Sequence, residues 1–126
     1  MSKTQGTKYI MPQELEVWYI LPAIRRELSK ALLDLDLSRE KIASILGVSK
    51  ASISHYLRRK RAKEVDFDKE LIQRIRNSAE RIATNEGLYM KEVQQLCKFI
   101  RKSRRLCQIH RERESSTYAT CTVCLE

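Results

Sequence analysis

Hydrophobic positions in the first third of the chain recur at helical spacing. One apolar residue falls on the same helix face every three or four positions, at Ile24, Leu28, Ala31, Leu32 and Leu35. This row predicts a helix that ends near Asp36. Before it, Pro12 can open a short helix through Ile20, because proline is tolerated in a first turn. Pro22 predicts a boundary between the two helices, since the residue before a proline avoids the helical region.

The next stretch predicts two short helices joined by a tight turn. Ser38 is the expected N-cap of the first, whose apolar face consists of Ile42, Ala43, Ile45 and Leu46. Gly47 ends that helix, with a positive φ expected. Ser49 is the expected cap of the second helix, which runs to about Arg59 and turns inward Ile53, Tyr56 and Leu57.

The second half of the chain predicts two more helices. One begins near Asp66 or Asp68, ends at residues 85–87 and buries Leu71, Ile72, Ile75, Ala79, Ile82 and Ala83. Another is marked by Val93, Leu96, Cys97 and Ile100, and the periodicity weakens beyond Ser103. The sequence therefore predicts an all-α protein. We divide it into an N-terminal arm and short helix (1–21), a helical domain (22–86), and a C-terminal helix with a cysteine module (87–126).

Basic residues outnumber acidic ones and are clustered. The chain has 25 Lys and Arg against 16 Asp and Glu, a formal net charge of +9. Residues 51–63 hold five basic residues and no acidic one, and residues 91–114 hold eight basic and three acidic ones. Clustered positive charge of this size favours a polyanionic partner such as nucleic acid.

Residues 38–61 have the spacing of a helix-turn-helix. Such a motif needs a small residue where the helices cross, a residue with positive φ in the turn, and apolar residues that fix the second helix. Ala43 and Gly47 meet the first two needs, and Val48, Ile53 and Leu57 fill the apolar positions.

The same residues resemble a known family. The pattern I-A-x-x-L-G-V-S, followed by S-x-S-x-Y-L, resembles the XRE class of helix-turn-helix regulators, whose fold is that of the lambda repressor. The resemblance covers about residues 22–85. The chain as a whole, with cysteines after the motif, is also similar to small archaeal regulators of this class.

The resemblance implies roles for individual residues. Five residues at the start of the second helix would face base edges in the major groove: Ser49, Lys50, Ala51, Ser52 and His55. Lys50 would read a guanine, and Ala51 would touch a thymine methyl. Arg39 would hold a phosphate and brace Lys50, while the remaining phosphate contacts would come from Arg58, Arg59, Lys60 and Arg61. Position 50 holds Lys where Gln is common in the family, so no base preference is carried over.

Four cysteines predict a metal or cluster site near the C-terminus. They are Cys97, Cys107, Cys121 and Cys124, and the last two have C-x-x-C spacing. His110 follows Cys107 at C-x-x-H spacing and is an alternative ligand of a Cys3His zinc site. Cys97 and Cys107 would lie about 15 Å apart on one helix, so both can be ligands only if the helix breaks near Ser103.

Two cofactors and two thiol-only states remain open for these cysteines. We favour an iron–sulfur cluster over zinc, because glycine and proline are missing around C-x-x-C and irregular spacing is familiar in cluster sites. Unliganded thiols, or disulfides formed on oxidation, are the alternatives. Basic neighbours such as Lys98, Arg101 and Lys102 are expected to lower the pKa of nearby thiols or to form a second phosphate-binding surface.

Together these patterns predict a cytoplasmic, sequence-specific transcriptional regulator that senses metal or redox state. The start of the chain lacks a signal peptide, and no apolar run is long enough to span a membrane. A homodimer is expected to form through the apolar first helix (Val17, Trp18, Ile20, Leu21) or through residues 93–100. The alternative is a non-specific nucleoid or adaptor protein with a structural zinc site. An enzyme is not expected, because no phosphate loop and no nucleophile–His–carboxylate set is present.

Overall fold

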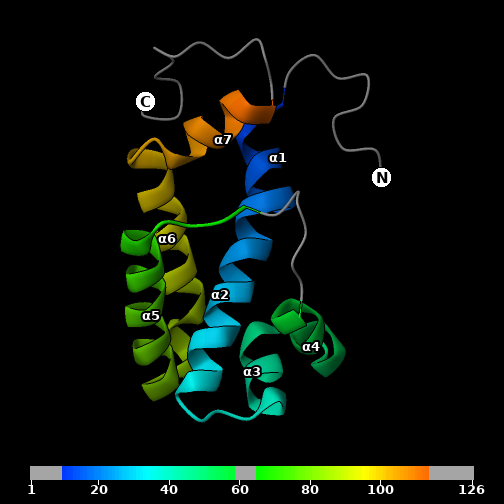
Figure 1. Ribbon diagram of the computed structural model, residues 1–126. Helices are drawn as coiled ribbons and strands as arrows, with labels where there is room; N and C mark the ends of the chain where they lie inside the picture. The colour runs from blue at the N-terminus through cyan, green and yellow to red at the C-terminus, as the bar shows by residue number, and fades with distance from the viewer. Residues whose placement is uncertain (1–9, 59–64, 114–126) are drawn as a thin grey trace.

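A computed structural model describes residues 10–58 and 65–113, and every regular element in these two ranges is a helix (Figure 1). The predicted all-α class is confirmed. In chain order the elements are α1 (Pro12–Leu15), a π-helical turn (Glu16–Ile20), α2 (Leu21–Asp34), α3 (Arg39–Leu46), α4 (Lys50–Arg58), α5 (Lys69–Thr84), a 3-10 turn (Glu86–Leu88), α6 (Tyr89–Lys102) and α7 (Arg105–Arg113). None of these helices is both long and apolar enough to cross a membrane.

The helix expected to break at Pro22 is continuous from Pro12 to Asp34. A π-helical turn lies directly before the proline, where the Leu21 N–H donates to the Glu16 carbonyl five residues back. Pro22 has no N–H, and its ring would crowd the carbonyl of Trp18 in a regular helix. The wider π turn relieves this conflict without ending the helix. The predicted boundary at Pro22 is therefore wrong, and the helix crosses the expected division between residues 21 and 22.

This long helix is the centre of the fold. In Figure 1, α5 and α6 lie on one side of α2, α3 and α4 lie on the other, and α7 returns across the top to α1. Several large side chains of the long helix and its neighbours are completely buried, among them Leu15, Ile24, Leu28, Leu32, Ile53 and Ile82. Burying such side chains is worth about 1.5–3 kcal/mol each, so this packing is the main source of stability.

The expected helix caps are confirmed. The Ser38 Oγ accepts a hydrogen bond from the Lys41 N–H at 3.0 Å, and Gly47 has a φ of 71°. Asp68 caps α5 through the Leu71 N–H at 3.1 Å. Asn85 follows α5 and caps the 3-10 turn through the Gly87 N–H at 3.0 Å.

The last helix, α7, was not expected from the periodicity. The chain turns at Ser103 and Arg104, where Arg104 has a φ of 67°, and then continues as α7. Leu106, Cys107 and Ile109 are buried, so a few apolar side chains fix the helix against α1 and α6. The break near Ser103, required if Cys97 and Cys107 were to meet, is present.

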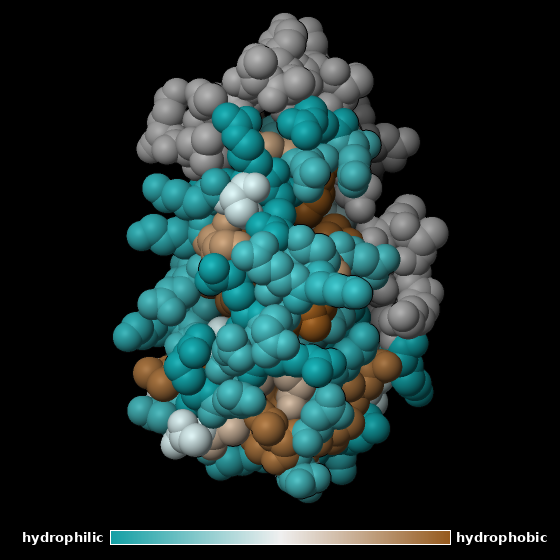
Figure 2. All heavy atoms as spheres, turned by 60° about the vertical axis from the view of Figure 1, so that its left-hand side comes forward, coloured by the Kyte–Doolittle hydropathy of each residue, from teal (hydrophilic) through white to brown (hydrophobic). Residues whose placement is uncertain are grey.

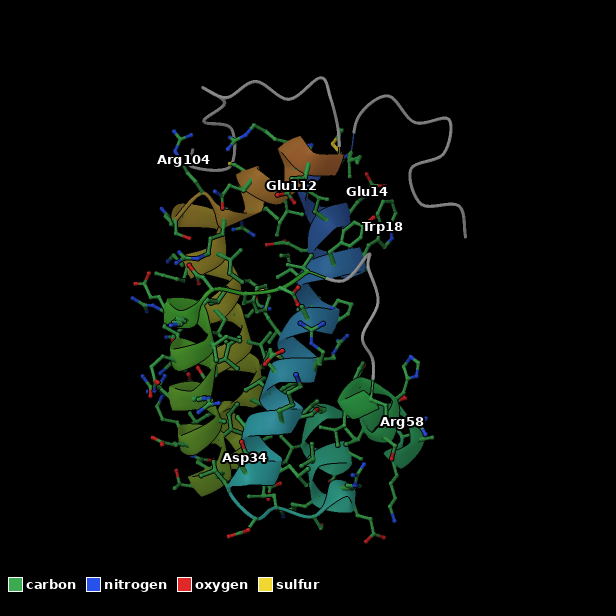
Figure 3. All side chains as sticks on the ribbon, in the orientation of Figure 1. Glu14, Trp18, Asp34, Arg58, Arg104 and Glu112 are labelled. Atoms are coloured by element: carbon green, nitrogen blue, oxygen red, sulfur yellow. The ribbon has the colours of Figure 1, made fainter. Side chains whose placement is uncertain are left out.

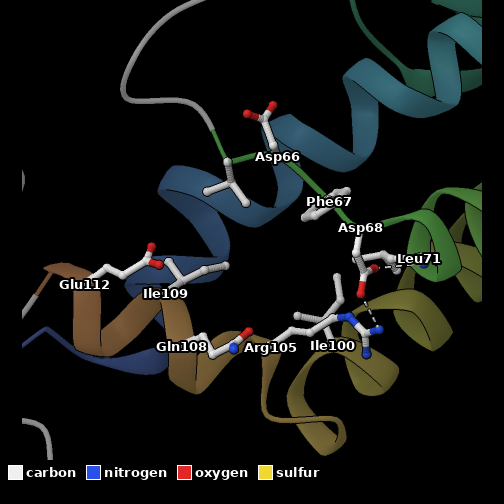
Figure 4. Close-up of a pocket in the computed structure, with 10 residues that line it drawn as sticks. Asp66, Phe67, Asp68, Leu71, Ile100, Arg105, Gln108, Ile109 and Glu112 are labelled. Carbon is white, nitrogen blue, oxygen red and sulfur yellow. Dashed lines mark hydrogen bonds and ion pairs between the residues drawn. The ribbon is translucent and has the colours of Figure 1, made fainter.

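Asp68 also ties α7 to the start of α5 (Figure 4). Its second carboxylate oxygen accepts from the Arg105 guanidinium at 2.7 Å, and Glu70 accepts from the same group at 2.9 Å. The hydrogen bond from Arg105, together with the Leu71 N–H, lowers the pKa of Asp68. Beside this ion pair lies a cavity of about 200 Å³ between residues 65–68 and helices α5, α6 and α7.

One buried carboxylate joins α5 to α6. Glu92 is 4% exposed and accepts hydrogen bonds from Ser78 at 2.8 Å and from Arg81 at 2.9 Å through each oxygen of its carboxylate. The Arg81 guanidinium, followed by the Ser78 hydroxyl, lowers the pKa of Glu92 against the opposing effect of burial. The pair therefore stabilises the fold only while Glu92 is ionised.

Replacing Glu92 with Gln should destabilise the protein by about 1–2 kcal/mol at neutral pH, because the charge on the buried acceptor is lost while Arg81 stays half exposed and screened. The folded pKa of Glu92 lies below its ordinary value of 4.5. The parent protein therefore holds this stability above about pH 4.5 and loses it as pH falls through the folded pKa. Urea unfolding at neutral and acid pH should show the gap between parent and variant narrowing on acidification. The exposed Glu80→Gln serves as control, and a gap independent of pH would contradict this reading.

Candidate nucleic-acid interface

Helices α3 and α4 form a compact pair held by their connecting turn. Gly47 adopts the left-handed conformation, and the Val48 N–H donates to the Ala43 carbonyl at 3.0 Å. Ala43 is buried and Val48 is half-buried at the junction. A side chain at Gly47 would meet no steric obstacle, so the backbone conformation alone explains the glycine. The turn fixes the direction in which α4 leaves α3.

The first turn of α4 is organised by two serines. The Ser49 Oγ accepts the Ser52 N–H at 3.0 Å and lies 2.9 Å from the Ser52 hydroxyl. Ser49 is therefore the cap of α4, as expected. Ser52 is half-buried, whereas Lys50 and Ala51 are exposed beside it. Of the residues predicted to face base edges, Ser49, Lys50, Ala51 and His55 are exposed, and Ser52 is half-buried.

The inner face of α4 is fixed against α2 and α3. Ile53 is completely buried, and Tyr56 and Leu57 are half-buried against the core. The outer face presents Lys50, Ala51, His55 and Arg58, and Figure 3 shows Arg58 directed away from the bundle. The predicted inner face of α4, formed by Ile53, Tyr56 and Leu57, is confirmed.

The N-terminus of α4 carries positive charge from both its side chains and its helix dipole. Its first turn contains no acidic residue and begins with Lys50. A cation at a helix N-terminus adds to the positive end of the helix dipole and costs stability unless an anion is near. The exposed start of α4 is therefore a region of positive potential that suits a phosphate or an electron-rich base edge.

Arg39 contacts α4 through a residue that the sequence did not single out. Its guanidinium Nη1 donates to the Ser54 Oγ at 3.2 Å. The expected bracing of Lys50 by Arg39 is not the contact that the structure shows. Both side chains are cations and would repel each other, whereas the neutral Ser54 hydroxyl can accept from Arg39. Both Arg39 and Ser54 lie near the outer surface, so a phosphate contact from Arg39 remains a prediction. The other predicted phosphate contacts, Arg59, Lys60 and Arg61, lie outside the described residues.

The two described cysteines are part of the packed interior. Cys97 on α6 is 7% exposed and Cys107 on α7 is 3% exposed, while His110 on α7 is half-buried. Within residues 10–58 and 65–113 no three Cys, His, Asp or Glu side chains are grouped closely enough to hold a metal ion. Cys121 and Cys124 lie outside the described residues, so the metal or cluster site remains a prediction.

The environment of Cys97 disfavours the ionised form of its thiol. Burial, with a smaller contribution from the nearby carboxylate of Glu16, raises the pKa of this thiol from 9.0 to about 11, although Arg101 opposes the shift. Metals bind the thiolate, which this environment disfavours. The expectation that basic neighbours lower the pKa is therefore wrong for Cys97. The sequence showed the basic neighbours, whereas the apolar packing and Glu16, 81 positions away, come from the fold.

Many of the apolar residues expected to form a dimer interface are instead buried by packing within one chain. Ile20 is completely buried, and the apolar residues of 93–100 face the core. Trp18 and Leu21 are half-buried, and Val17 is 59% exposed. The apolar side chains of Val93, Leu96, Cys97 and Ile100 pack within the chain itself. A homodimer stays a prediction.

No protein-family model matches the chain, and comparisons with curated proteins and with solved structures found no similar protein.

The raised pKa of Cys97 predicts slow reaction with thiol reagents. Near pH 8 its thiolate fraction should be about one hundredth of that of an ordinary thiol. We expect a variant that retains only Cys97 (C107S, C121S, C124S) to react with a colorimetric disulfide reagent at least tenfold more slowly when folded than in urea. Circular dichroism would check that the variant folds. Equal rates in the two states would show that the thiol is accessible and ionised as in an unfolded chain.

Proposed function

We propose that the α3–α4 pair is a helix-turn-helix that binds double-stranded DNA and that the protein is a transcriptional regulator of the XRE, lambda-repressor-like type. The observation that carries the proposal is α4 itself: a helix capped at its start, buried along one face and basic and free of acidic residues along the other. The sequence resemblance at residues 42–57 supports the same assignment.

In this proposal α4 enters the major groove with its N-terminal half toward the bases. Lys50 donates to the N7 and O6 acceptors of a guanine, Ala51 meets a thymine methyl, and His55 extends along the same face. Arg58 and Arg39 bind phosphates and set the register of the helix in the groove. Ser49 and Ser52, engaged with each other, keep the first turn of α4 in place.

The contacts that hold α4 against the rest of the fold favour sequence-specific base readout over non-specific electrostatic binding. Ile53 anchors α4 to the core, and the Arg39–Ser54 hydrogen bond joins the outer sides of α3 and α4. A side chain that must meet one base edge needs a fixed starting position, because misplacement loses the bidentate geometry. We therefore favour a specific site over uniform binding. By the same resemblance we expect a cytoplasmic homodimer that reads two half-sites related by a two-fold axis.

Selection from random duplex DNA with the full chain tests the proposal. Enrichment of a short sequence, repeated as a palindrome, is the expected result. A protein that binds DNA but enriches no sequence would be the non-specific nucleoid protein instead, and a protein that binds no duplex would rule out both.

Two substitutions separate base reading from phosphate binding. Lys50→Ala should relax the preference at one base pair by about 1–3 kcal/mol. Arg58→Ala should weaken all sequences alike and reduce the slope of log affinity against log salt by about 1. Fluorescence anisotropy with the selected duplex and its single-base variants measures both effects. Lys69→Ala, which removes an exposed lysine at the start of α5, is the matched control. An unchanged site preference for Lys50→Ala would remove this residue from the reading face.

The regulatory signal is proposed to be metal or redox state, acting through an iron–sulfur cluster or zinc. The C-x-x-C spacing of Cys121 and Cys124 supports this part, and burial of Cys97 argues that the tail cysteines are the main ligands. Iron, sulfide and zinc content should be measured after anaerobic purification. We expect C121S/C124S to lose the metal and C97S to retain it. A parent protein without metal would refute the sensing proposal and leave DNA binding untouched.

A further inference from the structure

Helix α6 presents a second basic face. Its exposed polar residues recur at helical spacing and lie on one side of the helix: Lys91, Gln94, Gln95, Lys98 and Lys102. The three lysines span about 16 Å along the helix axis. Figure 2 brings α5 and α6 forward, and hydrophilic residues prevail on that side of the molecule.

The one carboxylate on α6 is used mainly inside the bundle, although the charge of Lys91 also helps to lower its pKa. The single acidic residue of the helix, Glu92, is buried and bound to Ser78 and Arg81. Several other cations in the described residues lie against carboxylates: Arg101 pairs with Glu16 at 2.7 Å, Arg105 with Asp68 at 2.7 Å and Lys30 with Glu27 at 3.5 Å. The α6 face shares this lack of paired carboxylates with the outer face of α4.

The lysine row lowers the stability of the free protein. Lys98 and Lys102 are four residues apart, where like charges repel each other across one helical turn. Gln94 and Gln95 lie between Lys91 and Lys98, and their amides can donate hydrogen bonds to phosphate oxygens without adding charge. Binding of a polyanion to this face would reduce the repulsion between the lysines and would use the hydrogen-bond donors of the glutamines.

A hollow beside this face has the donors that a phosphate group needs. Arg74, Asn77, Arg81 and Gln95 line it, together with Phe99 and the neutralised Glu92. The guanidinium of Arg74 lies 3.7 Å from the centroid of the Phe99 ring, which fixes its orientation next to Gln95. A stacked guanidinium still directs its N–H groups sideways, where they can bind a phosphate.

The two basic faces are on opposite sides of the molecule. In Figure 1, α4 lies to one side of the long helix, and α6 lies to the other, behind α5. α4 packs on α2 and α3, whereas α6 packs on α5 and α7. A straight duplex whose major groove holds α4 therefore cannot also reach the lysines of α6.

We propose that the α6 face binds the phosphate backbone of a second DNA duplex, so that one protein molecule bridges two DNA segments. The inference rests on the proposed function, because α4 holds the first duplex. Binding at α6 is electrostatic and independent of base sequence, since lysines and glutamines along a flat helix face reach phosphates but not groove edges.

A capture assay tests this with the full chain. A duplex that carries the selected site is fixed to beads, protein is added, and a fluorescent duplex of unrelated sequence is offered. The parent protein should retain the fluorescent duplex. The triple variant K91Q/K98Q/K102Q should bind the fixed duplex as the parent does but lose capture of the second, by about a hundredfold at 0.1 M salt, since each phosphate contact contributes about −0.9 to the salt slope.

The control variant removes the same charge elsewhere. K30Q/K69Q/R76Q alters exposed or half-buried cations of α2 and α5, and both triple variants lower the formal net charge from +9 to +6. We expect the control to capture the second duplex nearly as well as the parent. Thermal unfolding checks that both variants fold, and sedimentation checks that both keep the oligomeric state of the parent.

Four outcomes would overturn the inference. Capture by the α6 variant equal to that of the parent would assign bridging to another surface or to a dimer, with DNA binding by α4 intact. An equal loss of capture in the control variant would show that net charge, and not the α6 face, determines binding of the second duplex. If the parent binds vesicles containing phosphatidylserine through these lysines and captures no second duplex, the face is a membrane-binding surface. If the parent does not bind even the fixed duplex, the proposed function itself fails, which is a distinct result.

Discussion

The structure depends on one constraint: a single helix from Pro12 to Asp34 must bury apolar side chains on more than one side. Ile24, Leu28 and Leu32 are completely buried, and neighbouring helices cover them from both directions. The π turn before Pro22 matters because it lets this helix continue where a proline would otherwise end it. With the long helix intact, α3 and α4 can pack on one side and α5 and α6 on the other, and the two basic faces are thereby kept apart.

A buried arginine on α2 also holds the fold together, because its guanidinium has hydrogen-bond partners. Arg26 is 6% exposed on α2, yet its guanidinium donates to the Val65 carbonyl at 2.9 Å and to Glu27 at 3.0 Å. The first contact attaches the segment after α4 to the central helix, 39 residues away in sequence. An unpaired buried guanidinium would cost several kcal/mol, so the route of the chain from α4 to α5 is tied to α2 by hydrogen bonding as well as by apolar packing.

Local rules predicted the elements whose signals lie within a few residues. Ser38, Gly47 and Asp68 end or begin helices through contacts within their own turns, so the sequence placed them correctly. Contacts between distant segments were beyond such rules. α7 has only a few apolar positions, and its burial depends on α1, which lies about ninety positions earlier. The Arg39–Ser54 hydrogen bond requires the crossing angle of α3 and α4. The raised pKa of Cys97 depends on core packing and on Glu16, whereas the sequence around it shows only basic neighbours.

Several carboxylates of the chain form ion pairs within the helical bundle. Glu16, Glu27, Asp68, Glu70, Glu86 and Glu92 each pair with a cation from the described residues. Most of these pairs lie between helices, where they hold the bundle together. These pairs neutralise cations of the bundle, with Asp68 and Glu70 sharing Arg105. α4 lacks an acidic residue altogether, and α6 has only the buried Glu92. The exposed cations of α4 and α6 therefore have no exposed carboxylate on their own helices, and the fold determines the separation of these two faces.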